Sequence, residues 1–243
     1  HRTASDKEST PPLLLLHGAA SSHLDWPAQL RRLPHTAVYA LDLPGHGKSA
    51  PPGCQSISAY TAVVSGFVTQ LGLPQVVVLG HSMGGAIAQQ LGHEQPPWLA
   101  GLVLLGTAAV MPVNPTMLAQ IQTDYTAVVD FLVRYQWSKN VPESLRQLSH
   151  QRLQQNDPAV VYGDFYACNQ FDARPYLADI QLPTLVIGGT ADKMTPFSQS
   201  QFLADNIPHS QLIAIEGAGH YLFLERPVEV SQAVAEFLAQ FAG

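Results

Sequence analysis

Charged residues are scarce in this chain, and that scarcity excludes several classes of partner. Asp, Glu, Lys and Arg make up 12% of the 243 residues, and the formal net charge is −6. No run of Lys or Arg is present, so nothing in the sequence favours an electrostatic grip on nucleic acid or on an anionic membrane. We therefore expect a small, weakly charged molecule as partner, and the composition leaves the oligomeric state open.

Cysteine is almost absent, and its spacing points to no shared chemistry. The two cysteines, Cys54 and Cys168, lie far apart without a CxxC pattern, so we predict free thiols rather than a disulfide. The ten histidines form neither an HExxH nor an HxH pair, so we predict no metal site. No cofactor is expected.

Long apolar runs are missing as well. No stretch approaches the ~20 apolar residues that a membrane-spanning helix needs, and the start of the chain does not read as a signal peptide. The chain begins with His1 rather than Met, which is compatible with a trimmed start. We expect no stable insertion into a membrane and take the cytoplasm as the default location.

What is present is a regular alternation of short apolar runs with segments of helical spacing. With 46% hydrophobic residues the chain can bury one large α/β core. We predict an α/β fold with a mostly parallel, doubly wound sheet of about six to eight strands. Residues 1–10 are polar and are predicted to be loose. The predicted strands are 13–16, 37–41, 75–80, 99–105, 184–189 and 211–215; the predicted helices are 25–33, 57–71, 83–95, 197–206 and 228–241.

The rhythm changes between residues 111 and 179, where helix-like segments follow one another without a convincing strand. They cover 125–137, 143–153 and 158–169. We interpret 111–179 as a helical lid inserted before the last two strands of the sheet, which divides the core into residues 1–110 and 180–243. An independent helical subdomain, unconnected to the site, is the alternative.

A serine lies at the sharpest predicted turn of the chain. The apolar run that starts at Val76 leads into Gly80-His81-Ser82-Met83-Gly84 and then into a helix. Flanking glycines let strand and helix approach closely, so the Ser82 hydroxyl projects above the edge of the sheet. The N-terminus of the helix adds backbone N–H groups where an acyl-transfer reaction develops negative charge. The alternative is a tight glycine turn with a bystander serine.

A serine nucleophile needs a base and an acid that orients it. Asp192 follows the strand at 184–189, and His220 follows the last strand, both in glycine-rich loops. The chain order Ser, Asp, His is that of hydrolases with this serine turn. Asp192 as a helix cap and His220 as an ordinary loop histidine are the alternatives.

These motifs resemble the α/β-hydrolase superfamily over nearly the whole chain. The resemblance implies that Ser82 is the nucleophile, His220 the general base and then acid, and Asp192 its orienting carboxylate. It also implies an oxyanion hole formed by the N–H groups of Met83 and Ala19, with Ala20 as the neighbouring possibility for the second. The matching blocks are His17-Gly18, Asp42 to Ser49, Gly80 to Gly85, Asp192 with Thr195-Pro196, and Gly217 to His220 followed by Leu224 to Pro227. Residues 1–12 are too short and polar to supply the N-terminal hairpin of typical members.

Several neighbouring residues have two readings. His17, His46 and His81 adjoin the motifs, and we predict structural hydrogen bonding for them rather than proton transfer. Four aromatic residues could line an acyl pocket or simply pack in the core or lid, and the sequence leaves both open. They are Trp26, Tyr125, Phe131 and Trp137.

The predicted function is that of a serine hydrolase that cleaves carboxylic esters of small or medium acyl groups through an acyl-enzyme, in the manner of esterases and monoacylglycerol lipases. A lactone, thioester or carbon–carbon bond hydrolase of the same fold is the first alternative. A small-molecule receptor with vestigial hydrolysis is the second.

Overall fold

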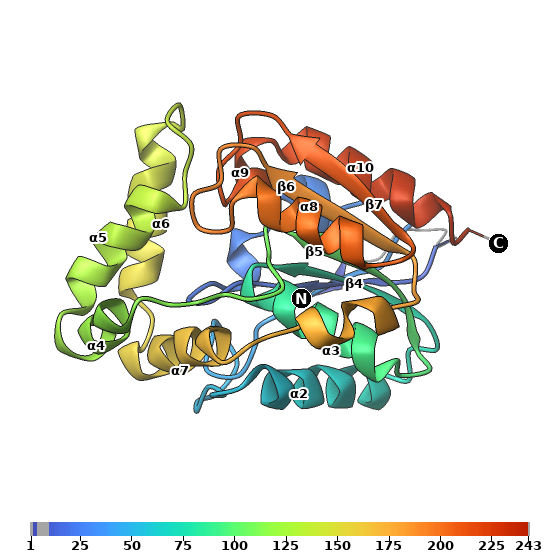
Figure 1. Ribbon diagram of the computed structural model, residues 1–243, viewed down its shortest axis with the longest axis horizontal. Helices are drawn as coiled ribbons and strands as arrows, with labels where there is room; N and C mark the ends of the chain where they lie inside the picture. The colour runs from blue at the N-terminus through green and yellow to red at the C-terminus, as the bar shows by residue number, and fades with distance from the viewer. Residues whose placement is uncertain (1, 4–9, 243) are drawn as a thin grey trace.

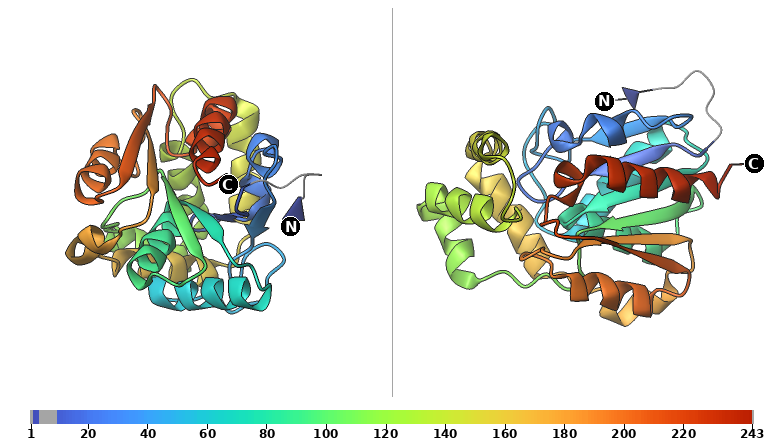
Figure 2. Two further views of the ribbon diagram at one scale, coloured as in Figure 1. Left: turned by 90° about the vertical axis from the view of Figure 1, so that its right-hand side faces the viewer. Right: turned by 90° about the horizontal axis from the view of Figure 1, so that it is seen from above.

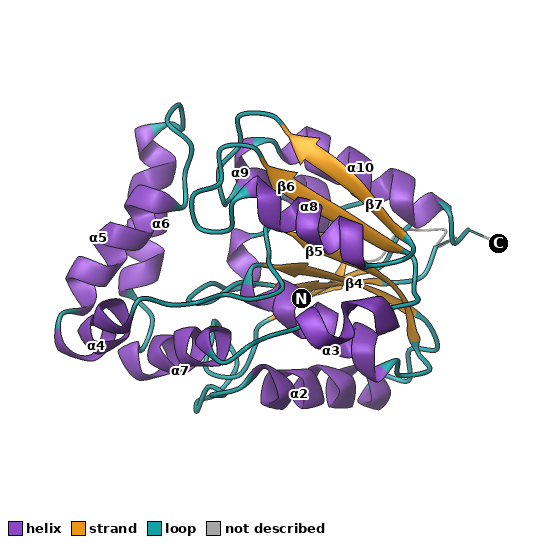
Figure 3. Ribbon diagram, viewed as in Figure 1, coloured by secondary structure: helices purple, strands orange, loops and turns teal. Residues whose placement is uncertain are grey.

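The computed structural model describes residues 2–3 and 10–242, which form a twisted sheet flanked by helices (Figures 1 and 3). The seven strands follow the order β1-β3-β2-β4-β5-β6-β7. All neighbouring pairs from β3 to β7 are parallel, and β1 is antiparallel to β3. The predicted fold class is confirmed. The strands are β1 (Arg2–Thr3), β2 (Leu13–Leu16), β3 (Val38–Leu41), β4 (Val76–His81), β5 (Leu99–Leu105), β6 (Thr184–Gly189) and β7 (Ser210–Ile215).

The central strands are apolar throughout because helices cover both faces of the sheet. Side chains alternate along β2, so that Leu14 and Leu16 enter one core while Leu13 and Leu15 enter the other. The first core is covered by α2 (Ile57–Gln70), α3 (Met83–Glu94) and α8 (Phe197–Asn206); the second is covered by α1 (Ala28–Arg31), α9 (Leu222–Glu225) and α10 (Pro227–Ala239). Figure 2 shows α2 and α10 on opposite sides of the sheet.

The helix predicted over 25–33 is wrong. A short 3₁₀ helix, η1 (His23–Asp25), is followed by a break and then by α1. Pro27 causes the break, because proline disfavours helical backbone at the residue before it and is itself tolerated only at a helix start. Pro27 accordingly sits at the N-cap of α1 in extended conformation.

The N-terminal segment differs from the prediction of a loose stretch over residues 1–10. Arg2 pairs with Tyr39 and Thr3 with Val38, which adds an antiparallel edge to the sheet. Residues 1 and 4–9, the rest of the predicted loose stretch apart from Thr10, lie outside the described residues. The described part of this segment therefore forms a single antiparallel strand at the edge of the sheet.

Four helices, here called the inserted helices, lie between β5 and β6. They are α4 (Pro115–Thr123), α5 (Tyr125–Tyr135), α6 (Glu143–Gln154) and α7 (Pro158–Asn169). They share a separate apolar cluster that includes Ile121, Val128 and Val161, and Ala20 of the core joins it. They lie beyond the carboxyl ends of the parallel strands (Figure 2). A further 3₁₀ helix, η2 (Arg174–Asp179), packs back against α3.

No helix among the described residues is both long enough and apolar enough to cross a bilayer.

Candidate active site

Ser82 links the end of β4 to the start of α3 with an uncommon backbone conformation. Its φ is 52° and its ψ is −116°, a combination that side chains rarely adopt. Two hydrogen bonds hold it there: its N–H donates to Leu105 O at 3.1 Å, and its carbonyl accepts from the Thr107 hydroxyl at 2.8 Å. The turn is therefore fixed by β5 and by the loop that follows it.

Asp192 and His220 lie together in the loops that follow β6 and β7, at the carboxyl edge of the sheet. Asp192 Oδ2 lies 2.8 Å from His220 Nδ1, and both residues are buried. Burial opposes the charge of Asp192, but His220 and hydrogen bonds from Thr195 outweigh it and lower the pKa of Asp192. Because Nδ1 faces a carboxylate, the proton of a neutral His220 belongs on Nδ1 and Nε2 is left as the free base.

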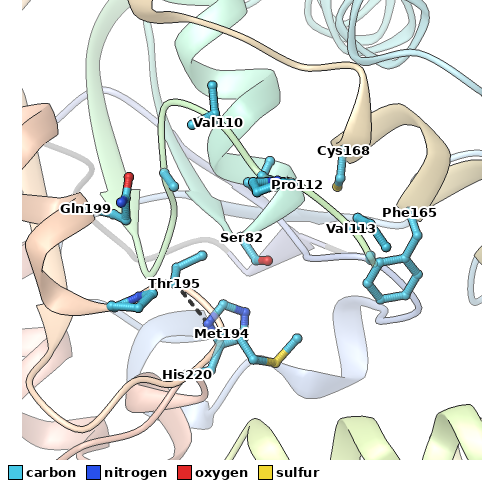
Figure 4. A pocket seen from close by; sticks show the side chains of 14 residues that line it. Ser82, Val110, Pro112, Val113, Phe165, Cys168, Met194, Thr195, Gln199 and His220 are labelled. Carbon is cyan, nitrogen blue, oxygen red and sulfur yellow. Dashed lines mark hydrogen bonds between the residues drawn. The ribbon is translucent and has the colours of Figure 1, made fainter. Parts of the chain in front are cut away.

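Ser82 lines two cavities, and Figure 4 shows the larger of them. The larger, of about 230 Å³, is mainly apolar, and the smaller is about 30 Å³. Both are lined by Ala19, Ser82, Phe165, Met194 and His220. The larger is completed by Ala108, Val110 to Val113, Cys168, Thr195, Pro196 and Gln199; the smaller by Gly18, His81, Leu132, Gln136, Leu153 and Tyr221. Ser82 and His220, far apart in the sequence, thus share one space.

The four aromatic residues considered for the pocket line neither of these two cavities. The side chains of Trp26 and Trp137 are packed in the core. Tyr125 donates a hydrogen bond to Leu153 O at 2.7 Å, and Phe131 is 46% exposed beside Tyr135. Packing describes Trp26, Tyr125 and Trp137, whereas Phe131 is largely exposed and contacts Tyr135.

Ala19 and Ala20, in the loop after β2, are the two candidates for one N–H donor near Ser82. The Ala20 N–H is already bonded to Asp164 Oδ2 at 2.9 Å, whereas Ala19 lines both cavities. Met83 is the first residue of α3, where N–H groups have no partner within the helix. The geometry thus favours Ala19 over Ala20.

The three histidines beside the motifs are buried and hydrogen-bonded. His81 Nε2 lies 3.0 Å from His220 O, so its N–H supports the backbone of that loop. His17 Nδ1 faces Gly18 O at 2.8 Å, and His17 Nε2 accepts from the Leu43 N–H at 3.0 Å, which makes His17 a neutral ring. Burial, with the nearby His46 adding to it, lowers the pKa of His17 to about 4.

The low pKa of His17 predicts a loss of stability in acid. The folded protein resists protonating His17 while the unfolded chain takes up the proton near pH 6.5, so stability is lost as the pH falls from 6.5 through about 4. This contribution amounts to about 3 kcal/mol. Urea unfolding at pH 6.5 and pH 4 should show a smaller acid-induced drop in His17→Asn than in the wild type. Equal drops in both proteins would show that His17 is not responsible.

Asp164, on α7, is a buried carboxylate that the sequence analysis missed. It accepts hydrogen bonds from the Ala20 N–H, from His46 Nε2 and from the Tyr60 hydroxyl. Its position in a helix of the predicted lid gives no signal of these partners, which lie more than a hundred residues earlier in the chain.

Metal and disulfide chemistry find no support among residues 2–3 and 10–242. No group of three or more His, Cys, Asp or Glu side chains there could hold a metal ion. Cys54 and Cys168 are both free thiols, as the spacing predicted.

Ser82, Asp192 and His220 lie on loops at the carboxyl edge of the parallel strands, the edge at which open α/β sheets usually bind their ligands. The profile of the alpha/beta hydrolase family matches residues 13–233. The chain therefore belongs to the alpha/beta hydrolase family.

Its relatives include esterases. A pimeloyl-[acyl-carrier protein] methyl ester esterase from Yersinia enterocolitica is 30% identical, over 94% of this chain and 93% of its own length. A thermophilic esterase from Thermogutta terrifontis has a TM-score of 0.89 and 27% identity, covering 100% of this chain and 93% of that one. An enol-lactonase from Burkholderia xenovorans LB400 has a TM-score of 0.90 at 23% identity, covering 98% and 96%, which is a likeness in fold alone.

Proposed function

We propose that this protein hydrolyses carboxylic esters through an acyl-enzyme on Ser82. One observation carries the proposal: Ser82, on a strained turn, shares its cavity with His220, whose Nδ1 is held by the buried Asp192. A strained residue and a buried, oriented histidine in one cavity are typical of sites where reactivity is prepared in advance.

The proposed reaction has two halves. His220 Nε2 takes the proton of Ser82 Oγ as that oxygen attacks the ester carbonyl, and the resulting oxyanion accepts hydrogen bonds from the Met83 and Ala19 N–H groups. His220 then gives the proton to the departing alcohol. In the second half His220 activates a water, which releases the acid and restores Ser82. The inserted helices act as a lid, because Phe165 and Cys168 of α7 form part of the cavity wall.

The two cavities define the substrate by size. The larger has room for an apolar chain, whereas the smaller holds a group about the size of one or two water molecules. We propose an ester with one long apolar arm and one short arm, which agrees with the methyl esters on which the Yersinia enterocolitica relative acts by name.

A set of three esters tests this proposal: methyl hexanoate, hexyl acetate and hexyl hexanoate. At least one of the first two should be turned over well, while hexyl hexanoate, with two long arms, should have a kcat/KM lower by about 10- to 100-fold. Met194 lines both cavities, so Met194→Ala should join them and reduce that difference.

Three outcomes would contradict the proposal. Equal turnover of all three esters by the wild type would remove the size argument. Absence of turnover of any ester, together with failure of a fluorophosphonate to label Ser82, would remove the hydrolase itself. Labelling without turnover would leave a competent nucleophile and shift the function towards a receptor.

A further inference from the structure

The backbone of Ala20 forms hydrogen bonds with two side chains of the segment that carries the inserted helices. Its N–H donates to Asp164 Oδ2 at 2.9 Å, and its carbonyl accepts from Asn156 Nδ2 at 2.8 Å. Its φ of 56° lies in the left-handed region, which alanine seldom adopts. Backbone in such a conformation persists only where its surroundings fix it. Asp164 thus fixes the Ala19–Ala20 peptide group, and Asn156 fixes the Ala20–Ser21 peptide group. The N–H of the latter donates at 3.3 Å to Gly18 O, in the peptide group that carries the Ala19 N–H.

Asp164 is fully buried and accepts hydrogen bonds from three donors. Besides the Ala20 N–H, its Oδ2 accepts from His46 Nε2 at 2.8 Å, and its Oδ1 accepts from the Tyr60 hydroxyl at 2.5 Å. These donors come from the loop after β2, the loop after β3 and α2, so one carboxylate of α7 ties three parts of the core together. A buried carboxylate with this many partners is held rigidly.

His46 balances the charge of Asp164. Its Nε2 faces the carboxylate, and its Nδ1 faces Pro44 O at 3.0 Å, so both ring nitrogens must donate and the ring is an imidazolium. Burial lowers the pKa of His46, but the Asp164 carboxylate and the hydrogen bonds outweigh burial and leave that pKa raised. The carboxylate that holds the Ala20 N–H is therefore part of a buried ion pair between α7 and the core.

Asn156 is fixed at the turn between α6 and α7. Its Nδ2 also lies 3.3 Å from Leu153 O and 3.4 Å from Arg152 O, two carbonyls in the last turn of α6. The side chain therefore continues the end of α6 and reaches the Ala20 carbonyl from there. Next to it, Arg152 forms an ion pair with Asp25 at 2.6 Å, a contact between α6 and the core that does not involve Ala20.

We propose that Asp164 and Asn156 are positioning residues for ester hydrolysis. By fixing Ala20 they aim the N–H of Ala19 at the oxyanion, so seating the inserted helices and completing the oxyanion hole are one event. This inference rests on the proposed function, in which the Ala19 N–H contacts the oxyanion. Because that contact forms only in the transition state, its loss lowers kcat and leaves KM nearly unchanged.

Three variants separate positioning from simple stability. Asn156→Asp keeps the shape of the side chain and removes the donor to Ala20, and Asp164→Asn keeps the shape and removes the charge. Arg152→Gln is the matched control, since it breaks the neighbouring contact between α6 and the core. The readouts are kcat and KM for methyl hexanoate, and the inhibition constant of an alkyl trifluoromethyl ketone, whose oxygen occupies the oxyanion position once Ser82 adds to it.

We expect Asn156→Asp and Asp164→Asn to lower kcat by about 10- to 100-fold, to change KM by less than about threefold, and to weaken the trifluoromethyl ketone by the same factor as kcat. Arg152→Gln should stay within about twofold of the wild type in all three. If Asp164→Asn does not fold, the half-exposed Asn156→Asp decides, because it leaves the buried ion pair intact.

The inference is overturned if kcat of Asn156→Asp matches that of the wild type, if its KM rises as much as its kcat falls, or if Arg152→Gln loses as much. These results require an active wild type, so they leave the proposed function standing. A wild type that neither turns over esters nor adds the ketone at Ser82 removes the proposed function, and the inference falls with it.

Discussion

Replacing Ser82 by alanine should lower kcat for a short ester by about 10⁴- to 10⁶-fold, the range expected when a nucleophile is removed from a group that acts as a unit. No other hydroxyl takes its place, because among the residues lining the two cavities the only other hydroxyls belong to Thr195 and Tyr221. The Thr195 hydroxyl donates to Asp192 and is not available to attack a carbonyl. Steady-state kinetics and fluorophosphonate labelling of both proteins give the comparison.

Ser200→Ala is the matched control for Ser82→Ala. The Ser200 hydroxyl is buried in α8 and has no hydrogen-bond partner among the described residues, so its removal should change neither kcat nor the urea midpoint appreciably. Ser82→Ala should also unfold at the wild-type urea concentration, because the two hydrogen bonds that hold the turn are made by the backbone of residue 82 and not by its side chain. A Ser82→Ala protein with undiminished kcat would end the proposed mechanism.

Gly84→Ala should be among the most damaging single methyl additions in the described part of the chain. A Cβ there would lie 2.1 Å from Leu16 O, and neither α3 nor the central strand β2 can move aside without disturbing Ser82 or the sheet. We expect a loss of about 4 kcal/mol or more in the free energy of unfolding, or no folded protein at all. Urea unfolding followed by circular dichroism measures the loss.

Gly66→Ala is the control for that experiment, because Gly66 lies inside helix α2 and a Cβ there meets nothing within 4 Å. The same substitution should raise the free energy of unfolding by about 0.5–1 kcal/mol. If Gly84→Ala stayed within 1 kcal/mol of the wild type, the close approach of α3 to β2 would not be the reason for a glycine at this position.

Much of the fold could be predicted because its elements carry local signals. The strands β5 and β6 and the helix α8 have the predicted bounds, and proline or glycine marks one end of each. These signals depend on neighbours in the sequence, which is why they could be read without a structure. The sheet order was not predicted, because β3 and β4 follow each other in the chain but lie on opposite sides of β2.

The misses share a different cause. Pro27 was passed over inside an apparently helical pattern, although a proline there ends a helix. The strand at Arg2–Thr3 is held by backbone pairing with β3, and backbone pairing leaves no pattern in so short a segment. Sequence reasoning thus failed where one residue overrides a pattern and where the partner is backbone alone.

The candidate site divides in the same way. Ser82, Asp192 and His220 were singled out because each follows a strand in a glycine-rich loop, and the structure brings Asp192 and His220 within 2.8 Å of each other. Asp164 carries no such signal, because its partners come from 104 to 144 residues earlier in the chain. Only the folded arrangement of α7 against the core shows that this carboxylate matters.

The two hydrogen bonds to the Ala20 backbone also limit which chimeras of this protein can be made by exchanging segments. A chimera that took residues 111–179 from a relative would bring a new α7 against the same loop. If the transplanted segment had no hydrogen-bond acceptor at position 164, the Ala20 N–H would lose its partner, and if it had no donor at position 156, the Ala20 carbonyl would lose its partner. Specificity is therefore better changed by single substitutions in the cavity wall than by transplanting whole helices.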